Sequence, residues 1–150
     1  MIQRKQTLFL LAVLIINVIM FFLPFQETIL SNDLGIYKLS FMGGCGPAIY
    51  NGNDIYPKML NFLVIILSVL TIFLFKKRTL QYKLSNFLAL LNVFITGLFF
   101  LLTYAKEELI VETHFTFGAF LPIISAIFAL LAAHFIKKDE QMVRNSDRIR

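Results

Sequence analysis

The stretch FGAFLPIISAIFALLAAHFI occupies residues 117–136, and KKDEQMVRNSDRIR follows it directly at residues 137–150. The first stretch has no Asp, Glu, Lys or Arg, and its length is about what a helix needs to cross a bilayer. The second begins with two lysines and then mixes acidic and basic side chains. Lysines at the end of an apolar helix suit both the anionic headgroups and the negative end of the helix dipole. The junction therefore predicts a membrane span that stops at a polar tail.

The composition agrees with a membrane environment. Hydrophobic residues make up 58% of the 150-residue chain and charged residues 15%, against about 45–50% and 25% in soluble proteins. The net charge of +5 does not indicate nucleic acid as a partner, because the basic residues lie at the ends of apolar runs. Cys45 is the only cysteine, which excludes an intrachain disulfide and a cysteine-based metal cluster.

Four apolar segments are long enough to be membrane spans, and none contains Asp, Glu, Lys or Arg. We expect them to be helices, because a span must satisfy its backbone hydrogen bonds internally. The first is interpreted as a retained span, since no small-x-small cleavage site follows it. The predicted fold is an all-α membrane protein, a four-transmembrane-helix bundle in one domain over residues 1–150. The spans are predicted at residues 7–25, 59–75, 86–105 and 115–136.

The distribution of Lys and Arg predicts the orientation. Eleven basic residues fall on the side of the two termini and three on the other side. Because basic residues are retained on the cytoplasmic side, we expect both termini to be cytoplasmic.

The two outer loops carry different signals. ETILSNDLGIYKLSF, residues 27–41, has turn residues between two β-type runs and predicts a small β-hairpin in the first outer loop. KEELIVET, residues 106–113, is interpreted as a solvated loop. Its carboxylates and the adjacent His114 are types that bind metal, but solvation explains them more simply, so no metal site and no cofactor are predicted.

Polar side chains within the spans are the intramembrane candidates, with Asn17, Asn92 and His134 foremost. They could line a path for a solute or proton, or they could hydrogen-bond between helices. The second interpretation is preferred, because no ionisable residue lies deeper than His134. We expect Asn17 and Asn92 each to bond across a helix interface.

The polar tail shows helical charge spacing. Glu140 and Arg144 are four residues apart, with the acid first, and Met142 and Ile149 recur at seven residues. This pattern favours a helix that binds a protein surface, where charge complementarity selects the partner. The residues expected to contact a partner are Gln3, Arg4, Lys5, Asp139, Glu140, Val143, Arg144, Asp147, Arg148 and Arg150.

The two ends of the chain also resemble a known family. The opening MIQRKQTLFLLA and the ending KKDEQMVRNSDRIR are similar to the two signatures of the domain of unknown function 4293 family. The resemblance implies a small four-helix inner-membrane protein from a Gram-negative bacterium. It implies no reaction, because the family has no assigned activity.

The resulting hypothesis is a non-catalytic accessory or structural subunit of a larger membrane complex, with the lipid bilayer and other membrane subunits as partners. A homo-oligomer is compatible with it. The alternative is a small transporter or channel subunit that uses Asn17 and Asn92. A membrane enzyme would need acid–base groups or metal ligands that the sequence does not assemble.

Overall fold

The computed structural model describes residues 5–30, 36–40, 55–104 and 110–148. It contains four α-helices, two short 3-10 helices and three β-strands. The helices are α1 (Lys5–Met20), α2 (Ile55–Phe73), α3 (Arg78–Tyr104) and α4 (Leu121–Arg148). The 3-10 helices are η2 (Leu74–Lys76) and η4 (Phe117–Phe120), and the strands are β1 (Pro24–Leu30), β2 (Ile36–Ser40) and β3 (Ile110–Phe115).

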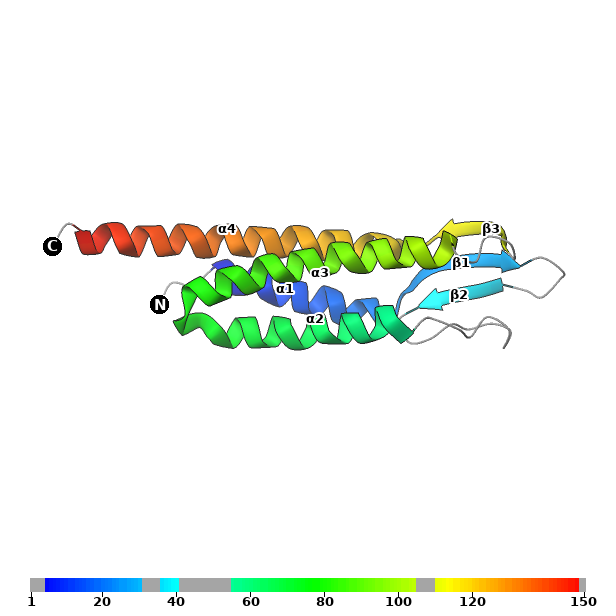
Figure 1. The fold of residues 1–150 in the computed structure, drawn as a ribbon, viewed down its shortest axis with the longest axis horizontal. Helices are drawn as coiled ribbons and strands as arrows, with labels where there is room; N and C mark the ends of the chain where they lie inside the picture. The colour runs from blue at the N-terminus through cyan, green and yellow to red at the C-terminus, as the bar shows by residue number, and fades with distance from the viewer. Residues whose placement is uncertain (1–4, 31–35, 41–54, 105–109, 149–150) are drawn as a thin grey trace.

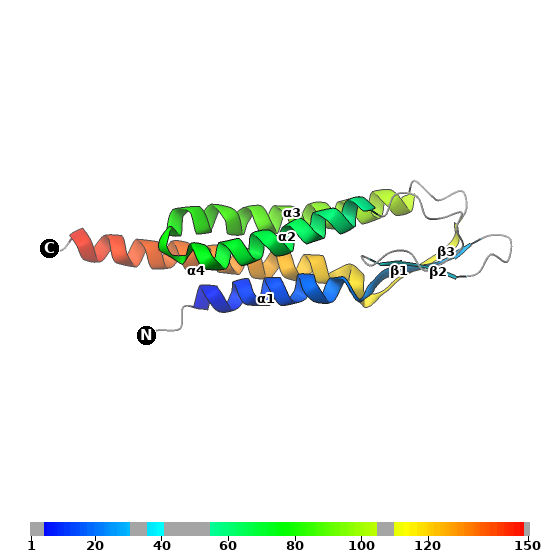
Figure 2. The same cartoon turned by 90° about the horizontal axis from the view of Figure 1, so that it is seen from below.

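The four helices form an elongated up-and-down bundle with the sheet at one end (Figure 1). Each helix packs on two neighbours, in the order α1, α4, α3, α2 around the bundle. Lys5 and the last turns of α4 lie at the end opposite the sheet, which Figure 2 shows from a second direction. We call these ends the sheet end and the basic end, because Lys77, Arg78 and Lys137 mark the latter.

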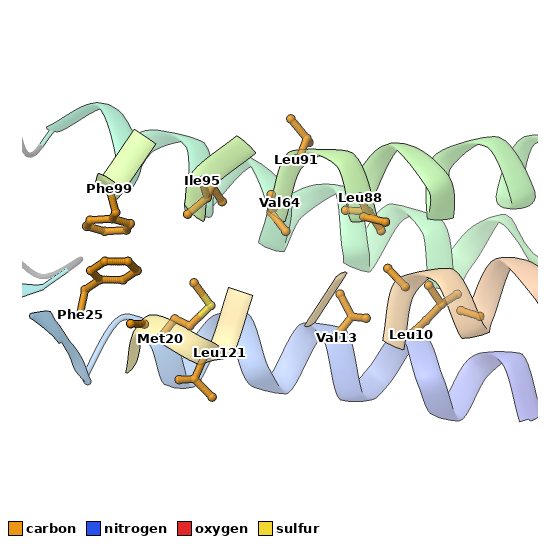
Figure 3. Packing of buried hydrophobic residues seen from close by; sticks show 14 residues of the cluster. Leu10, Val13, Met20, Phe25, Val64, Leu88, Leu91, Ile95, Phe99 and Leu121 are labelled. Atoms are coloured by element: carbon orange, nitrogen blue, oxygen red, sulfur yellow. The ribbon is translucent and has the colours of Figure 1, made fainter. Parts of the chain in front are cut away.

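The core follows from residue spacing on each helix. Residues recur at intervals of four and three on the buried face, as Leu10, Val13, Asn17 and Met20 do on α1. This spacing keeps one stripe facing neighbouring helices that are nearly aligned. Figure 3 shows the stripes of α1 and α3 meeting in the core, where most of the buried apolar side chains gather. Much of the outward surface is also apolar, which suits lipid rather than water.

Three of the helices are long and apolar enough to cross a membrane: α2, α3 and α4. The first helix, α1, has 16 residues and spans about 24 Å, which is less than a hydrocarbon core of about 30 Å. The expected first span, residues 7–25, runs five residues past the end of this helix, because α1 ends at Met20 and Pro24 already belongs to β1. Proline cannot continue the helical hydrogen-bond ladder.

The sheet is larger than the predicted hairpin. The pair β1–β2 is the expected antiparallel hairpin, but β3 adds to the other side of β1, giving the strand order β2–β1–β3. The described part of the loop that was interpreted as solvated is thus a strand. The expected fourth span likewise began too early, because Phe115 ends β3 and α4 starts at Leu121.

The sheet is fixed to the bundle through β1. The ring of Phe25 stacks on Phe99 of α3 with their centroids 3.9 Å apart, and Thr116 donates a backbone hydrogen bond to the Phe25 carbonyl. Gly118 packs so closely that an added Cβ would lie 2.2 Å from the Pro24 carbonyl oxygen. The sheet end is therefore a tightly packed cap.

Candidate functional site

The bundle interior contains many polar side chains. Among the described residues, the buried polar side chains are all uncharged. They come from every helix and from β1: Gln6, Asn17, Gln26, Asn61, Ser68, Thr71, Gln81, Ser85, Asn92 and Ser125. In an apolar bundle these residues are the natural candidates for function.

Three of them meet at one point. The Asn17 amide nitrogen of α1 donates to the Ser125 hydroxyl of α4 at 2.7 Å and to the Val13 carbonyl at 2.8 Å. The Asn61 amide of α2 donates to the Asn17 backbone carbonyl at 3.2 Å. The expected bond across a helix interface is thus present at Asn17, and three helices are joined there.

Asn92 of α3 lies at the same level. Arg78 at the start of α3 contacts Asp139 of α4, and the two helices run antiparallel. Asn92 lies fourteen residues after Arg78, and Ser125 lies fourteen residues before Asp139. Each helix therefore contributes one polar residue to a single layer, and we call Asn17, Asn61, Asn92 and Ser125 the asparagine layer.

The bonding of Asn92 differs from the expectation. Its amide nitrogen donates to the Leu88 carbonyl of its own helix at 2.9 Å. Such a bond to the residue four positions earlier does not join two helices. Asn92 is nevertheless fully buried, so its remaining amide atoms face the bundle interior.

A second polar layer lies nearer the basic end. The Gln81 amide of α3 donates to the Thr71 carbonyl of α2 at 3.2 Å, and Gln6 of α1 is buried. We call Gln6, Thr71 and Gln81 the glutamine layer. Gln6 precedes Asn17 by eleven residues on α1, and Gln81 precedes Asn92 by the same number on α3. At the rise of an α-helix, the two layers are about 16 Å apart.

The two layers contain all the buried side-chain polar atoms that lack a hydrogen-bond partner among the described residues. They are the amide oxygens of Asn17, Asn61, Asn92 and Gln81 and both amide atoms of Gln6. An unpaired buried polar group costs about 1–3 kcal/mol. Five of the six atoms are hydrogen-bond acceptors, so the layers can bind groups that donate hydrogen bonds.

Apolar contacts separate the asparagine layer from both ends of the bundle. On the basic side, Leu10 and Leu88 lie at one level of the core, between the two polar layers (Figure 3). On the sheet side, Met20 and Ile95 pack above the layer, followed by the stack of Phe25 on Phe99. The layer is closed in this structure.

His134 lies apart from both layers. Its side chain is exposed on α4, with its ring edge against Phe135 at a centroid distance of 5.8 Å. The structure therefore places Asn17 and Asn92 at one level of the bundle interior and leaves His134 outside it.

His114, Glu112 and Glu27 lie on the sheet. His114 is 3.5 Å from the Glu112 carboxylate, and it pairs in register with Glu27, whose carboxylate contacts Lys38 at 2.7 Å. Within the described ranges, no three His, Cys, Asp or Glu side chains are grouped so as to hold a metal ion. Cys45, Glu107 and Glu108 lie outside those ranges.

The residues expected to contact a partner differ in burial and in how much of them the structure describes. Asp139 and Glu140 are half-buried against α3: Arg78 donates to the Asp139 carbonyl and Thr79 to the Glu140 carboxylate, both at 3.4 Å. Val143 is exposed. The structure describes only the helical backbone at Lys5, Arg144, Asp147 and Arg148. Gln3, Arg4 and Arg150 lie outside the described residues.

Sequence reasoning singled out Asn17 and Asn92 but missed the layers. The spacing of eleven residues, three helical turns, that separates Gln6 from Asn17 and Gln81 from Asn92 could have revealed two levels on α1 and α3. Which residues of α2 and α4 complete each level depends on the offsets between helices, and these follow from tertiary packing.

Comparison with known proteins agrees with the resemblance seen at the two ends of the chain. A search of curated proteins gave no match. The family model described as "Domain of unknown function (DUF4293)" matches residues 2–149, which covers nearly the whole chain. The protein, with helices apolar enough to indicate a membrane protein, belongs to the DUF4293 family.

Proposed function

We propose that the protein is a non-catalytic accessory subunit of an inner-membrane complex, and that it binds its partner through the end of α4. The observation that carries the proposal is the length of α4. Its residue Asp139 already contacts the first residue of α3, yet the helix continues to Arg148. About 13 Å of helix thus projects beyond the bundle (Figures 1 and 2).

The projecting segment has the chemistry of a docking helix. Met142 and Val143 are about half exposed, and the sequence around them mixes Arg144, Asp147 and Arg148. A segment that only anchored the chain to anionic lipid would not need acidic residues. Since Asp139 and Glu140 contact α3, the proposed docking surface starts at Gln141 and runs to Arg148.

The proposed orientation has all four helices crossing the inner membrane and the basic end in the cytoplasm. The basic residues of the α2–α3 connection and of α4 gather at one end of the bundle. At the sheet end, Lys38 is paired with Glu27. The asymmetry of positive charge supports retention of the basic end inside.

Co-purification in mild detergent tests the docking role. Truncation after Glu140 removes the projecting segment from Gln141 onward but keeps the residues that contact α3, Asp139 and Glu140. We expect this truncation, and Arg144→Gln with Arg148→Gln, to lower partner recovery at least tenfold while the protein still accumulates in the membrane. Lys77→Gln with Lys83→Gln removes the same charge from the same end and should retain the partners. Full recovery with the truncated chain would contradict the proposal.

A second candidate, a small transporter or channel subunit, is favoured by the asparagine layer, which places a polar residue from every helix in the bundle interior. The apolar levels on both sides of the layer favour the accessory role in this conformation. Asn92→Leu discriminates between them. A null phenotype at a normal protein level would support transport.

A further inference from the structure

The asparagine layer has hydrogen-bonding capacity that the chain does not use. Asn17 donates through its amide nitrogen to two acceptors, Val13 and Ser125. Its amide oxygen, and those of Asn61 and Asn92, have no partner among the described residues, although each residue is fully buried. Three acceptors on three different helices thus share one level of the core.

Exchanging the oxygen and nitrogen positions of these side-chain amides does not give every amide atom a hydrogen-bond partner. If the Asn17 amide were turned over, its oxygen would face the Val13 carbonyl, which cannot donate. The same holds for Asn92 and the Leu88 carbonyl. The free oxygens are therefore set by the backbone acceptors that the amide nitrogens already bind.

The chemistry of these atoms selects the ligand class. A ligand must donate hydrogen bonds or carry positive charge, so an anion does not fit. A divalent cation would need carboxylates to offset its charge, and the buried residues described are all neutral. Water donates two hydrogen bonds, and buried waters commonly bind two to four polar groups that would otherwise be unpaired.

We propose that the asparagine layer binds ordered water, with the amide oxygens of Asn17, Asn61 and Asn92 as acceptors. The water completes a polar layer that includes all four helices at a depth where lipid offers no hydrogen bonds. The proposal does not rest on the docking role of α4, because it concerns the bundle interior alone. The glutamine layer has the same chemistry nearer the basic end, where bulk water is closer.

The test uses the full chain in lipid nanodiscs with ¹⁵N-labelled Asn and Gln side chains. Magnetization transfer from water to the side-chain amide protons is measured by NMR. We expect cross peaks from water at Asn17, Asn61 and Asn92, and also at Gln81 as a reference near the basic end. A cross peak at Gln81 with none at the three asparagines would overturn the proposal.

Variants separate bound water from other sources of the signal. Asn92→Leu removes one acceptor and should weaken the cross peaks of Asn17 and Asn61 at least twofold, whereas the lipid-facing Val93→Leu should leave them unchanged. Equal effects of the two variants would contradict a shared site. Ser125→Ala removes the layer's hydroxyl proton, and the Asn92 cross peak should persist. Its disappearance would identify the hydroxyl as the source and overturn the assignment to water.

Ion replacement separates water from a monovalent cation. Spectra are compared in NaCl, KCl and N-methylglucamine chloride at equal ionic strength. Bound water predicts the same asparagine side-chain shifts in all three salts. A change in the shifts on removal of sodium or potassium would assign the layer to a cation and contradict the proposal.

Discussion

Single residues hold this bundle together by two kinds of contact. Asn17 joins α1 to α4 through Ser125 and receives the amide of Asn61, so one side chain and its carbonyl connect three helices. Gly118 allows close approach of β1, because a side chain there would collide with the Pro24 carbonyl. Hydrogen bonds of Asn17 join the helices in the middle of the bundle. At the sheet end, the absence of a side chain on Gly118 allows β1 to pack closely.

A double-mutant cycle should detect the Asn17–Ser125 hydrogen bond. We expect Asn17→Leu alone to cost on the order of 1 kcal/mol of unfolding free energy. Its coupling to Ser125→Ala should be about 0.6 kcal/mol, and at most about 1.7 kcal/mol, as for other bonds within membranes. Unfolding in mixed micelles provides the measurement. Asn17→Leu with Ser85→Ala, a residue nearer the basic end, should show no coupling, and equal coupling in both cycles would contradict the bond.

Two glycine substitutions should have opposite effects. Gly118→Ala places a Cβ 2.2 Å from the Pro24 carbonyl oxygen and should lower the unfolding free energy by about 1–3 kcal/mol. Gly97→Ala, in α3, meets nothing within 4 Å and should be neutral or stabilising by up to about 1 kcal/mol. Thermal unfolding in detergent compares the two variants. Similar midpoints would show that β1 does not pack on Gly118 as described.

At the scale of elements, the length of the apolar segments and their lack of charged residues predicted the four helices, because membrane-spanning segments must be long and uncharged. The continuation of α4 to Arg148 follows its charge spacing. The strand β3 was missed because Glu112 suggested solvation, although IVETHF, residues 110–115, is rich in β-branched residues. Pairing with β1 decided its structure, and a partner strand distant in sequence is not visible from local pattern.

The stack of Phe25 on Phe99 should control the order of the sheet. Phe25→Ala empties a buried site, and such changes cost about 3–5 kcal/mol. We expect amide hydrogen exchange in β1 and β2 to accelerate at least a hundredfold, while the middle of α3 and α4 keeps its protection. Phe22→Ala, at a neighbouring residue that is 70% exposed, should leave the strands protected. Equal exchange in the two variants would contradict a role of the Phe25–Phe99 stack in ordering the sheet.

At the scale of the whole molecule, the chain combines a closed sheet cap, an apolar bundle with polar layers, and a basic end from which α4 projects. The short α1 lies between α2 and α4 in this arrangement and reaches from the basic end to the sheet. The proposal of four spans requires α1 to cross the bilayer as the other helices do. If all four helices cross, the sheet end and the basic end lie on opposite sides of the membrane. That arrangement, with the basic end in the cytoplasm, is the central claim.

Thiol labelling of intact and permeabilised cells tests this claim most directly. The native Cys45 lies in the sequence between β2 and α2, and Ser146→Cys in a Cys45→Ser background places the single thiol on the end of α4. We predict that a membrane-impermeant maleimide labels Cys45 in intact cells, and labels the α4 thiol only after the inner membrane is permeabilised. Labelling of both thiols in intact cells, or of neither before permeabilisation, would contradict a bundle that crosses the membrane with its basic end in the cytoplasm.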